Sequence, residues 1–249
     1  MSNFRPQGFN VLPMVTKNLL IINGLVFLAS ITFQNIFNYD INSELGLYYV
    51  GSEQFLPIQF ITYMFLHGNF NHLFSNMFAF WMFGSAVENF WGPKRFLYFY
   101  LATGIGAAII QQLVYYFRIE SISGQIDPES MQQMINQGGE ILNTGRNFVG
   151  ALGDINILYN INTVGASGSV FGILLAFGML FPNSMIYLFF AIPIKAKWLV
   201  LAYGTFELYS GIANNAGDNI AHFAHLGGML FGFLLIKYWQ KKDSNTGWQ

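Results

Sequence analysis

The chain has 249 residues, of which 53% are hydrophobic and only 9% are charged, with a net charge of -1. Soluble domains carry about a quarter charged residues, so this composition indicates an integral membrane protein and excludes an ordinary soluble domain. The near-zero charge argues against a nucleic-acid partner. The absence of cysteine excludes disulfides, a thiolate nucleophile and a cysteine-liganded metal.

Apolar stretches of nearly the length needed to span a hydrocarbon core predict an all-α, polytopic membrane protein with six transmembrane helices. The expected spans are 18–37, 71–90, 96–117, 165–181, 197–212 and 220–239. They form one bundle domain at 18–240, between a cytoplasmic segment at 1–17 and a cytoplasmic tail at 241–249. The N-terminal segment has no signal-peptide pattern, so we expect the first helix to be an uncleaved insertion signal.

Two segments between the spans need a separate interpretation. A polar stretch at 118–162 is expected to be an extracytoplasmic insertion, for which the sequence indicates no function. Within it, a proline in the first turn predicts a short helix at 127–137, stopped by Gly138-Gly139. The apolar segment 186–192 is flanked by prolines, which favours an interfacial connector over a further span.

Basic residues divide unevenly between the two sides of this six-span arrangement. Of the 11 lysines and arginines, only Arg118 and Arg146 fall on the side that carries the insertion. By the positive-inside rule the other side, with both termini, is cytoplasmic. No transit peptide is evident, so we expect the bilayer to be a bacterial plasma membrane.

Polar side chains gather at the outer ends of three predicted spans. Ser167 lies at the start of the fourth span, His225 near the start of the sixth, and His72 with Asn76 in the first turns of the second. Ionisable groups inside a membrane are costly, so they mark a functional site by default. Three separate segments are thus expected to meet at one depth, below the outer surface and open to the extracytoplasmic side.

The chemistry of these residues predicts nucleophilic catalysis. Neutral imidazole can take a serine proton near pH 7, so His225 is the expected base for Ser167. His72 and Asn76 share one helix face and could donate to an oxyanion, alongside the backbone N–H of Ser167. No carboxylate is well placed to orient His225, so we expect a dyad, with Phe171 packing against the imidazole.

The other two histidines, His67 and His222, are expected nearer the water. For them a hydrogen bond to a neighbouring loop is the favoured interpretation.

Small residues explain how the fourth and sixth helices could approach each other. Gly168 and Gly172 are four apart on one, and Gly228 and Gly232 are four apart on the other. Such stripes permit close backbone contact between membrane helices. Each stripe begins beside a proposed catalytic residue, which favours a meeting of Ser167 with the sixth helix.

Other function classes fit less well. The histidines could ligate a metal in a transporter or metalloprotease, but Phe223 follows His222 where an H-E-x-x-H motif requires glutamate. Asp154 lies in a polar loop without an aspartyl-protease motif and is expected to be solvated. Inverted repeats that would indicate a transporter are not detected.

Three motifs stand out: Gly165-Ala-Ser167-Gly168 with Gly172, His67-Gly-Asn-Phe-Asn-His72-Leu-Phe-Ser-Asn76, and Ala224-His225-Leu-Gly-Gly228 with Gly232. Together they closely resemble the rhomboid intramembrane serine proteases, over about residues 59–239. Glu88 in Gly84-Ser-Ala-Val-Glu88 resembles the structural glutamate of that family. An inactive relative that binds membrane clients is the nearest rival, and the presence of both Ser167 and His225 argues against it.

The resemblance implies a specific activity and site. Ser167 would be the nucleophile, His225 the general base and acid, and His72 and Asn76 the oxyanion donors, with no metal or organic cofactor. The partners would be the lipid bilayer and transmembrane protein substrates, expected to be single-pass, with small residues at the cleavage site and locally unstable helices. The loop at 213–219 and the fifth helix could gate access.

Two positions depart from the family pattern. Many rhomboids have a Trp-Arg pair where this chain has Ile58-Gln59, which bears on lipid anchoring and loop behaviour. Many also have tyrosine where Phe171 stands, and the change removes a hydroxyl while keeping an aromatic face.

Overall fold

The computed structural model describes residues 8–188, 191–213 and 222–245, and it is mostly helical, which confirms the all-α prediction. The helices in chain order are α1 (Met14–Phe37), α2 (Ile41–Leu45), α3 (Gln59–Thr62), the 3₁₀ turn η1 (Tyr63–Phe65), α4 (Phe70–Trp91), α5 (Pro93–Ser123), α6 (Pro128–Asn143), α7 (Ala151–Asn160), α8 (Ser167–Leu180), α9 (Ala196–Ala213) and α10 (His222–Asn245). The expected connector is an antiparallel hairpin of β1 (Met185–Leu188) and β2 (Ile192–Lys195).

Each predicted span coincides with a helix, but the bounds differ. Helix α5, which corresponds to the third predicted span, continues to Ser123 and so enters the expected insertion. Helix α10 continues to Asn245, so the start of the expected tail is helical. The expected start of the sixth span at 220 lies outside the described residues, as do 1–7 of the N-terminal segment and 246–249 of the tail. Among the described helices, α1 and α5 are long and apolar enough to cross a membrane, and α8 is a shorter apolar helix. The count of six spans stays a prediction.

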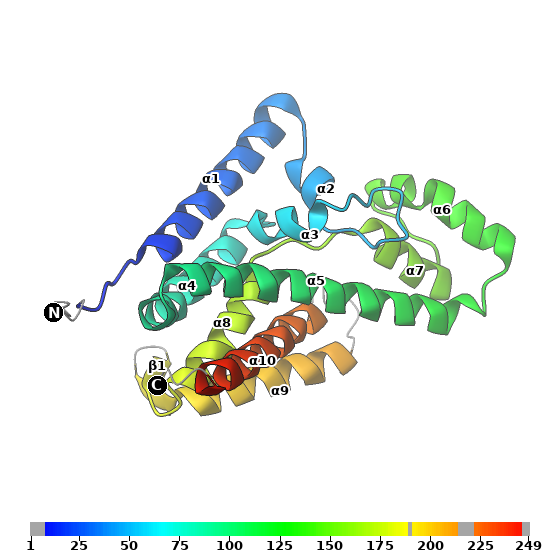
Figure 1. Cartoon of the computed structure of the whole chain (residues 1–249). Coiled ribbons are helices and arrows are strands. Elements are labelled where there is room, and N and C mark those ends of the chain that lie inside the picture. The colour runs from blue at the N-terminus through cyan, green and yellow to red at the C-terminus, as the bar shows by residue number, and fades with distance from the viewer. Residues whose placement is uncertain (1–7, 189–190, 214–221, 246–249) are drawn as a thin grey trace.

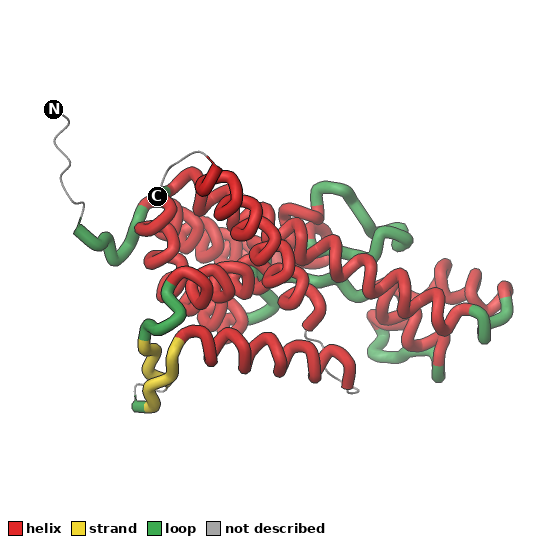
Figure 2. The backbone as a smooth tube through the Cα atoms, turned by 60° about the horizontal axis from the view of Figure 1, so that its bottom comes forward, coloured by secondary structure: helices red, strands yellow, loops and turns green. Residues whose placement is uncertain are grey.

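Helix α8 lies at the centre of the bundle and packs against α4, α5, α9 and α10. Figure 1 shows α5 running the length of the molecule, with α8, α9 and α10 on one side of it. Fully buried aromatic side chains fill the space between the helices, among them Phe80, Phe96, Phe99 and Tyr100. Figure 2 shows the hairpin at one end of the bundle and the helices of the insertion at the other.

The glycine stripes bring α8 and α10 into backbone contact. A Cβ added to Gly228 would collide with the carbonyl oxygen of Gly168, and one added to Gly232 would lie 3.4 Å from the oxygen of Gly172. The stripe on α8 also faces α5, where a Cβ on Gly172 would lie 2.8 Å from Thr103. Close approach on two sides fixes the position of Ser167, which begins α8.

Glu88 fastens the N-terminus of α1 to α4. Its carboxylate accepts hydrogen bonds from the backbone N–H groups of Val15 (2.8 Å) and Thr16 (2.7 Å) and from the Thr16 hydroxyl (2.7 Å). The first N–H groups of a helix lack intrahelical partners, and negative charge near them is favourable. The residue before α1, Pro13, supplies no side-chain cap, so Glu88 acts as one from another helix.

The insertion is more regular than the sequence indicated. Helix α6 does not stop at Gly138-Gly139 but continues to Asn143, because Gly138 is packed so tightly against Asn156 of α7 that a Cβ would collide with it. Helix α7 was not predicted at all. Asp154 is exposed, as expected, but it lies in the first turn of this helix and not in a loop.

A small second core holds the insertion to the end of α5. It consists of buried side chains from four parts of the chain: Tyr49, Ile119, Met134 and Ile155.

Candidate active site

The turn before α8 sets the position of Ser167. Gly165 has φ +134°, a conformation that side chains disfavour, and its N–H donates to the carbonyl of Tyr63 at 2.9 Å. A Cβ at this glycine would also lie 2.8 Å from Nε2 of His72. Ser167 is the first residue of α8, and the N-cap residue Ala166 makes no side-chain cap. The first N–H groups of α8 therefore lack a capping side chain and point toward the same end as the serine.

His225 of α10 lies against Ser167. Its Nε2 is 2.8 Å from the serine Oγ, within hydrogen-bond distance. The imidazole stacks on Phe171, one turn along α8, with ring centroids 4.2 Å apart and planes 6° from parallel. Ser167 is half-buried and His225 is buried, so the pair is largely shielded by the protein.

His72 and Asn76 reach the same region from α4. His72 lies in the first turn of α4, where its backbone N–H donates to the Asn69 side chain at 2.9 Å. Its ring borders Gly165. Asn76 is buried and donates one N–H to the carbonyl of His72 at 3.0 Å. An amide nitrogen carries a second N–H, which this bond does not use.

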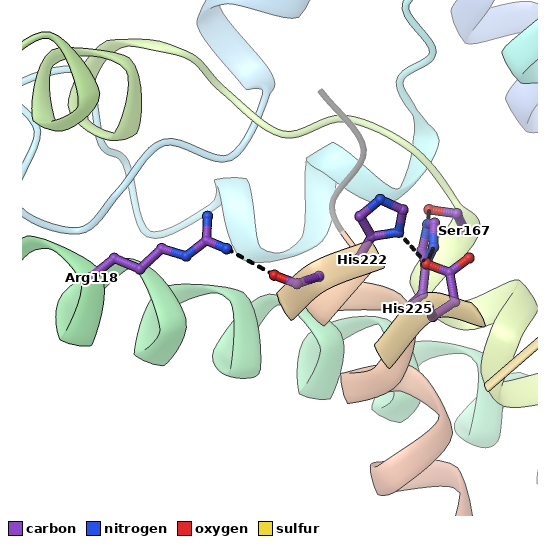
Figure 3. Close-up of polar contacts among 6 residues, drawn as sticks. Arg118, Ser167, His222 and His225 are labelled. Atoms are coloured by element: carbon purple, nitrogen blue, oxygen red, sulfur yellow. Dashed lines mark hydrogen bonds and ion pairs between the residues drawn. The ribbon is translucent and has the colours of Figure 1, made fainter. Parts of the chain in front are cut away.

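The expectation that no carboxylate is placed to orient His225 is wrong. Glu207, in the middle of α9, is 5% exposed, and its Oε2 lies 3.0 Å from Nδ1 of His225 and 2.6 Å from Nδ1 of His222. Figure 3 shows His222, His225 and Ser167 gathered at one place, where α8 and α10 meet. The contact with His222 is a hydrogen bond. The contact with His225 is short enough for an ion pair, but its geometry is not that of a hydrogen bond.

Glu207 was missed because it stands 15 positions before His222, on another helix. A signal was nevertheless present in the sequence. A lone carboxylate within an apolar helix is itself a functional-site hypothesis.

His67 and His222, which are expected nearer the water than the other two histidines, are both buried within the protein. His222 is 6% exposed and His67 is 1% exposed. The His67 ring lies edge-on to His72, with centroids 5.1 Å apart. It stands between η1 and α4, outside the predicted spans, where burial, together with the neighbouring His72, lowers the pKa of its imidazole to about 4.

Glu207, His222 and His225 are also a set of potential metal ligands, since their donor atoms lie within 4.8 Å of one another. Zinc bonds of about 2.0–2.1 Å would hold two tetrahedral ligands roughly 3.3 Å apart. The carboxylate oxygen is nearer than this to both rings. These distances therefore fit direct contacts between the carboxylate and the two imidazole N–H groups better than a metal ion bound between them.

Arg118 connects α5 to the far end of α9. Its Nη2 donates to the carbonyl of Gly211 at 3.1 Å, and its guanidinium lies 5.7 Å from the centre of the Phe223 ring on α10. Figure 3 shows the arginine reaching this carbonyl from α5. The loop expected to gate access, beyond Ala213, lies outside the described residues at 214–219.

Gln59, at the second position of the departure from the Trp-Arg pattern, bridges two parts of the loop before α4. Gln59 is fully buried, and its amide donates to the carbonyls of Glu44 and Gln54, both at 3.0 Å. Ile58 beside it is 52% exposed. Gln59 thus stabilises the loop between α1 and α4, which packs beside the site.

Comparison with known proteins gives a consistent result. The family model described as "Rhomboid domain" matches residues 54–123 and 137–241. The chain is 29% identical over 170 residues, 68% of its length, to RHOMBOID-like protein 12, mitochondrial, of Arabidopsis thaliana. It is 27% identical over 185 residues, 74% of its length, to Rhomboid protein 1, mitochondrial, of Saccharomyces cerevisiae.

A third similarity covers less of the chain. Rhomboid-like protein 11, chloroplastic, of Arabidopsis thaliana is 45% identical to the chain over 56 residues, which are 22% of the chain and 20% of the relative. The matches span 42% of the length of each of the two mitochondrial relatives. The names of all three refer to organelles, so they do not support the expected bacterial plasma membrane.

Proposed function

The chain belongs to the rhomboid family of integral membrane proteins, and from this premise we propose that it is an intramembrane serine protease. Its substrates are transmembrane proteins, and it hydrolyses peptide bonds in or near their membrane-spanning segments. The observation that carries the proposal is the 2.8 Å contact between His225 Nε2 and Ser167 Oγ at the start of a buried helix.

The mechanism begins with proton transfer. Nε2 of His225 takes the hydroxyl proton as Ser167 Oγ attacks the substrate carbonyl carbon, and the carbonyl oxygen becomes an oxyanion. The imidazolium then gives that proton to the leaving amine nitrogen as the C–N bond breaks. Water repeats the sequence on the acyl-enzyme, with His225 again as base, and frees Ser167.

Oxyanion stabilisation is assigned to three donors. The backbone N–H of Ser167 belongs to the uncapped first turn of α8, where the helix dipole also favours negative charge. The His72 ring and the second N–H of Asn76 complete the set from α4. His72 borders the turn at Gly165, and Asn76 is tied to His72 by a hydrogen bond to its carbonyl, which supports this assignment. Preorganised donors of this kind act most strongly on the charge that develops in the transition state.

Phe171 and the four glycines are assigned supporting roles. The stacked Phe171 ring restrains the imidazole plane, and the close contact of Gly168 with Gly228 keeps α8 and α10 at the separation the proton transfer needs. Gly172 and Gly232 keep the two helices close in the same way, one turn further along.

The proposal includes an orientation in the bilayer. Nine of the 11 basic residues fall on the side of both termini in a six-span arrangement, so that side is the cytoplasm or its equivalent compartment. The site then opens to the opposite face, from which water reaches Ser167. We further propose that substrates cross the membrane once and carry small residues and locally unstable helices at the cleavage site.

The decisive experiment uses the purified full chain in proteoliposomes with a single-pass model substrate. Wild type should cleave it, and Ser167→Ala should not, because the substitution removes the nucleophile without adding bulk. Both proteins should purify and melt alike. Cleavage at the wild-type rate by Ser167→Ala would overturn the serine mechanism. Loss of wild-type activity in a strong chelator, restored by zinc, would favour the metal alternative.

A further inference from the structure

Glu207 is a buried carboxylate with two histidine partners. Its Oε2 lies 2.6 Å from His222 Nδ1 and 3.0 Å from His225 Nδ1, and all three residues are less than 10% exposed. A charge in such surroundings is costly unless it is paired and hydrogen-bonded. A solvated acidic residue would need no special explanation, but a carboxylate buried as Glu207 is does need one.

The contact with Glu207 favours one tautomer of His225. An ionised carboxylate only accepts hydrogen bonds, so it stabilises the form of the ring that carries hydrogen on Nδ1, the atom nearest Oε2. His225 with Nδ1–H has a free lone pair on Nε2, and Nε2 is the atom 2.8 Å from Ser167 Oγ. This is the one neutral form of the ring that can accept the serine proton.

We propose that Glu207 is a positioning residue for His225, which makes the working set Ser167, His225 and Glu207 rather than a serine–histidine pair. The inference rests on the proposed protease function. When the Ser167 proton moves to Nε2, the Nδ1 proton stays on His225 and Glu207 stays ionised, so the carboxylate faces an imidazolium. The alignment of Nδ1–H with Oε2 tightens at that stage, as catalytic hydrogen bonds commonly do on substrate binding.

His222 holds the carboxylate in place from its other side. Its hydrogen bond to the same oxygen, at 2.6 Å, is shorter than the 3.0 Å contact of His225. His222 lies on the same helix as His225, three positions earlier. His222 therefore supports the base through Glu207, which contacts both rings. This gives a buried role to a histidine that the spacing alone assigned to the interface.

The test compares Glu207→Gln with Glu88→Gln in the full chain. Glu88 is as buried as Glu207, at 3% and 5% exposure, but lies about 24 Å along α4 from His72. Glutamine keeps the size of the side chain but can present an N–H to Nδ1, which favours the wrong tautomer. In serine proteases the equivalent carboxylate-to-amide change lowers kcat about 10⁴-fold.

Glu207→Gln should lower kcat by about 10²- to 10⁴-fold with little change in KM. The acidic limb of its pH profile should move to lower pH, because the imidazolium has lost the negative charge beside it. Among the described residues, the charged and titratable groups that face His225 are Glu207 from α9, His222 from α10 and His72 from α4, with Ser167 from α8. Glu207→Asp keeps the charge and should return the limb to its wild-type position.

Glu88→Gln should lower the melting temperature while the pH profile stays where it is in wild type. A kcat and an acidic limb in Glu207→Gln that match those of wild type would overturn the role of Glu207 and leave the protease function intact. A wild type as inactive as Ser167→Ala would overturn the function itself.

A measurement on unmutated protein covers the case in which Glu207→Gln does not fold. The nitrogen resonances of ¹⁵N-histidine-labelled wild type, with His225 assigned by its loss in His225→Ala, should show protonated Nδ1 and unprotonated Nε2. The opposite tautomer would overturn the proposal.

Discussion

Phe171 and His225 lie face to face, with ring centroids 4.2 Å apart and planes 6° from parallel. The contact restrains the imidazole in the plane from which Nε2 meets Ser167. Phe171→Leu should therefore lower kcat by about two- to tenfold, the equivalent of the roughly 0.5–1.5 kcal/mol that ring pairs contribute. Phe171→Tyr keeps the aromatic face and should retain most activity. Steady-state kinetics of the two variants provides the measurement, and equal loss in both would show that stacking is not what matters.

The oxyanion assignment predicts kinetic changes without binding changes. His72→Ala and Asn76→Ala should lower kcat with little effect on KM, because the donors act on charge that exists only in the transition state. Loss of one donor can cost about 10² to 10³ in rate, and two neighbouring donors that partly replace each other cost less singly. The double variant is decisive: turnover at the wild-type rate would remove both residues from the oxyanion site.

The contact between α8 and α10 predicts that a single methyl group destabilises the bundle. Gly228→Ala should lower the melting temperature strongly, because the new Cβ would collide with the carbonyl oxygen of Gly168. Gly24→Ala is a matched control within α1, where a Cβ meets no atom within 4 Å. Alanine there should be neutral or stabilising by about 0.5–1 kcal/mol, from helix propensity alone. Equal melting temperatures for the two variants would contradict the packing argument.

The sequence indicated the parts of the site that local motifs define. Ser167 stands among small residues at the start of an apolar run, and His225 precedes a glycine stripe, so both could be identified without a structure. Glu207 could not be assigned in this way, because its reach to His225 depends on the rotation of α9, which no local pattern specifies. The full length of α6 was missed for a related reason. Tight packing of Gly138 against Asn156 outweighs the low helix propensity of glycine in α6.

The expected topology can be tested cleanly because the chain has no cysteine. Single cysteines at Lys241 of α10 and Gln137 of α6, both exposed positions, should react with a membrane-impermeant maleimide from opposite sides of the membrane. In intact cells or right-side-out vesicles, Gln137→Cys should label and Lys241→Cys should label only after permeabilisation. Labelling of both from one side would overturn the six-span count and the direction in which the site opens.

Arg118 should determine how firmly the outer end of α9 is held. Its guanidinium bonds the carbonyl of Gly211 in the last turn of α9, and a cation there is favourable by about 0.3–1 kcal/mol. Arg118→Leu should therefore speed amide hydrogen exchange at residues 206–213 by about two- to fivefold, while exchange in α4 stays unchanged. Arg146→Leu, at an exposed arginine on the same side of the predicted topology, should leave α9 at its wild-type exchange rate. Because α9 carries Glu207, a looser helix end should also lower kcat modestly. Equal exchange in both variants would show that Arg118 does not restrain α9.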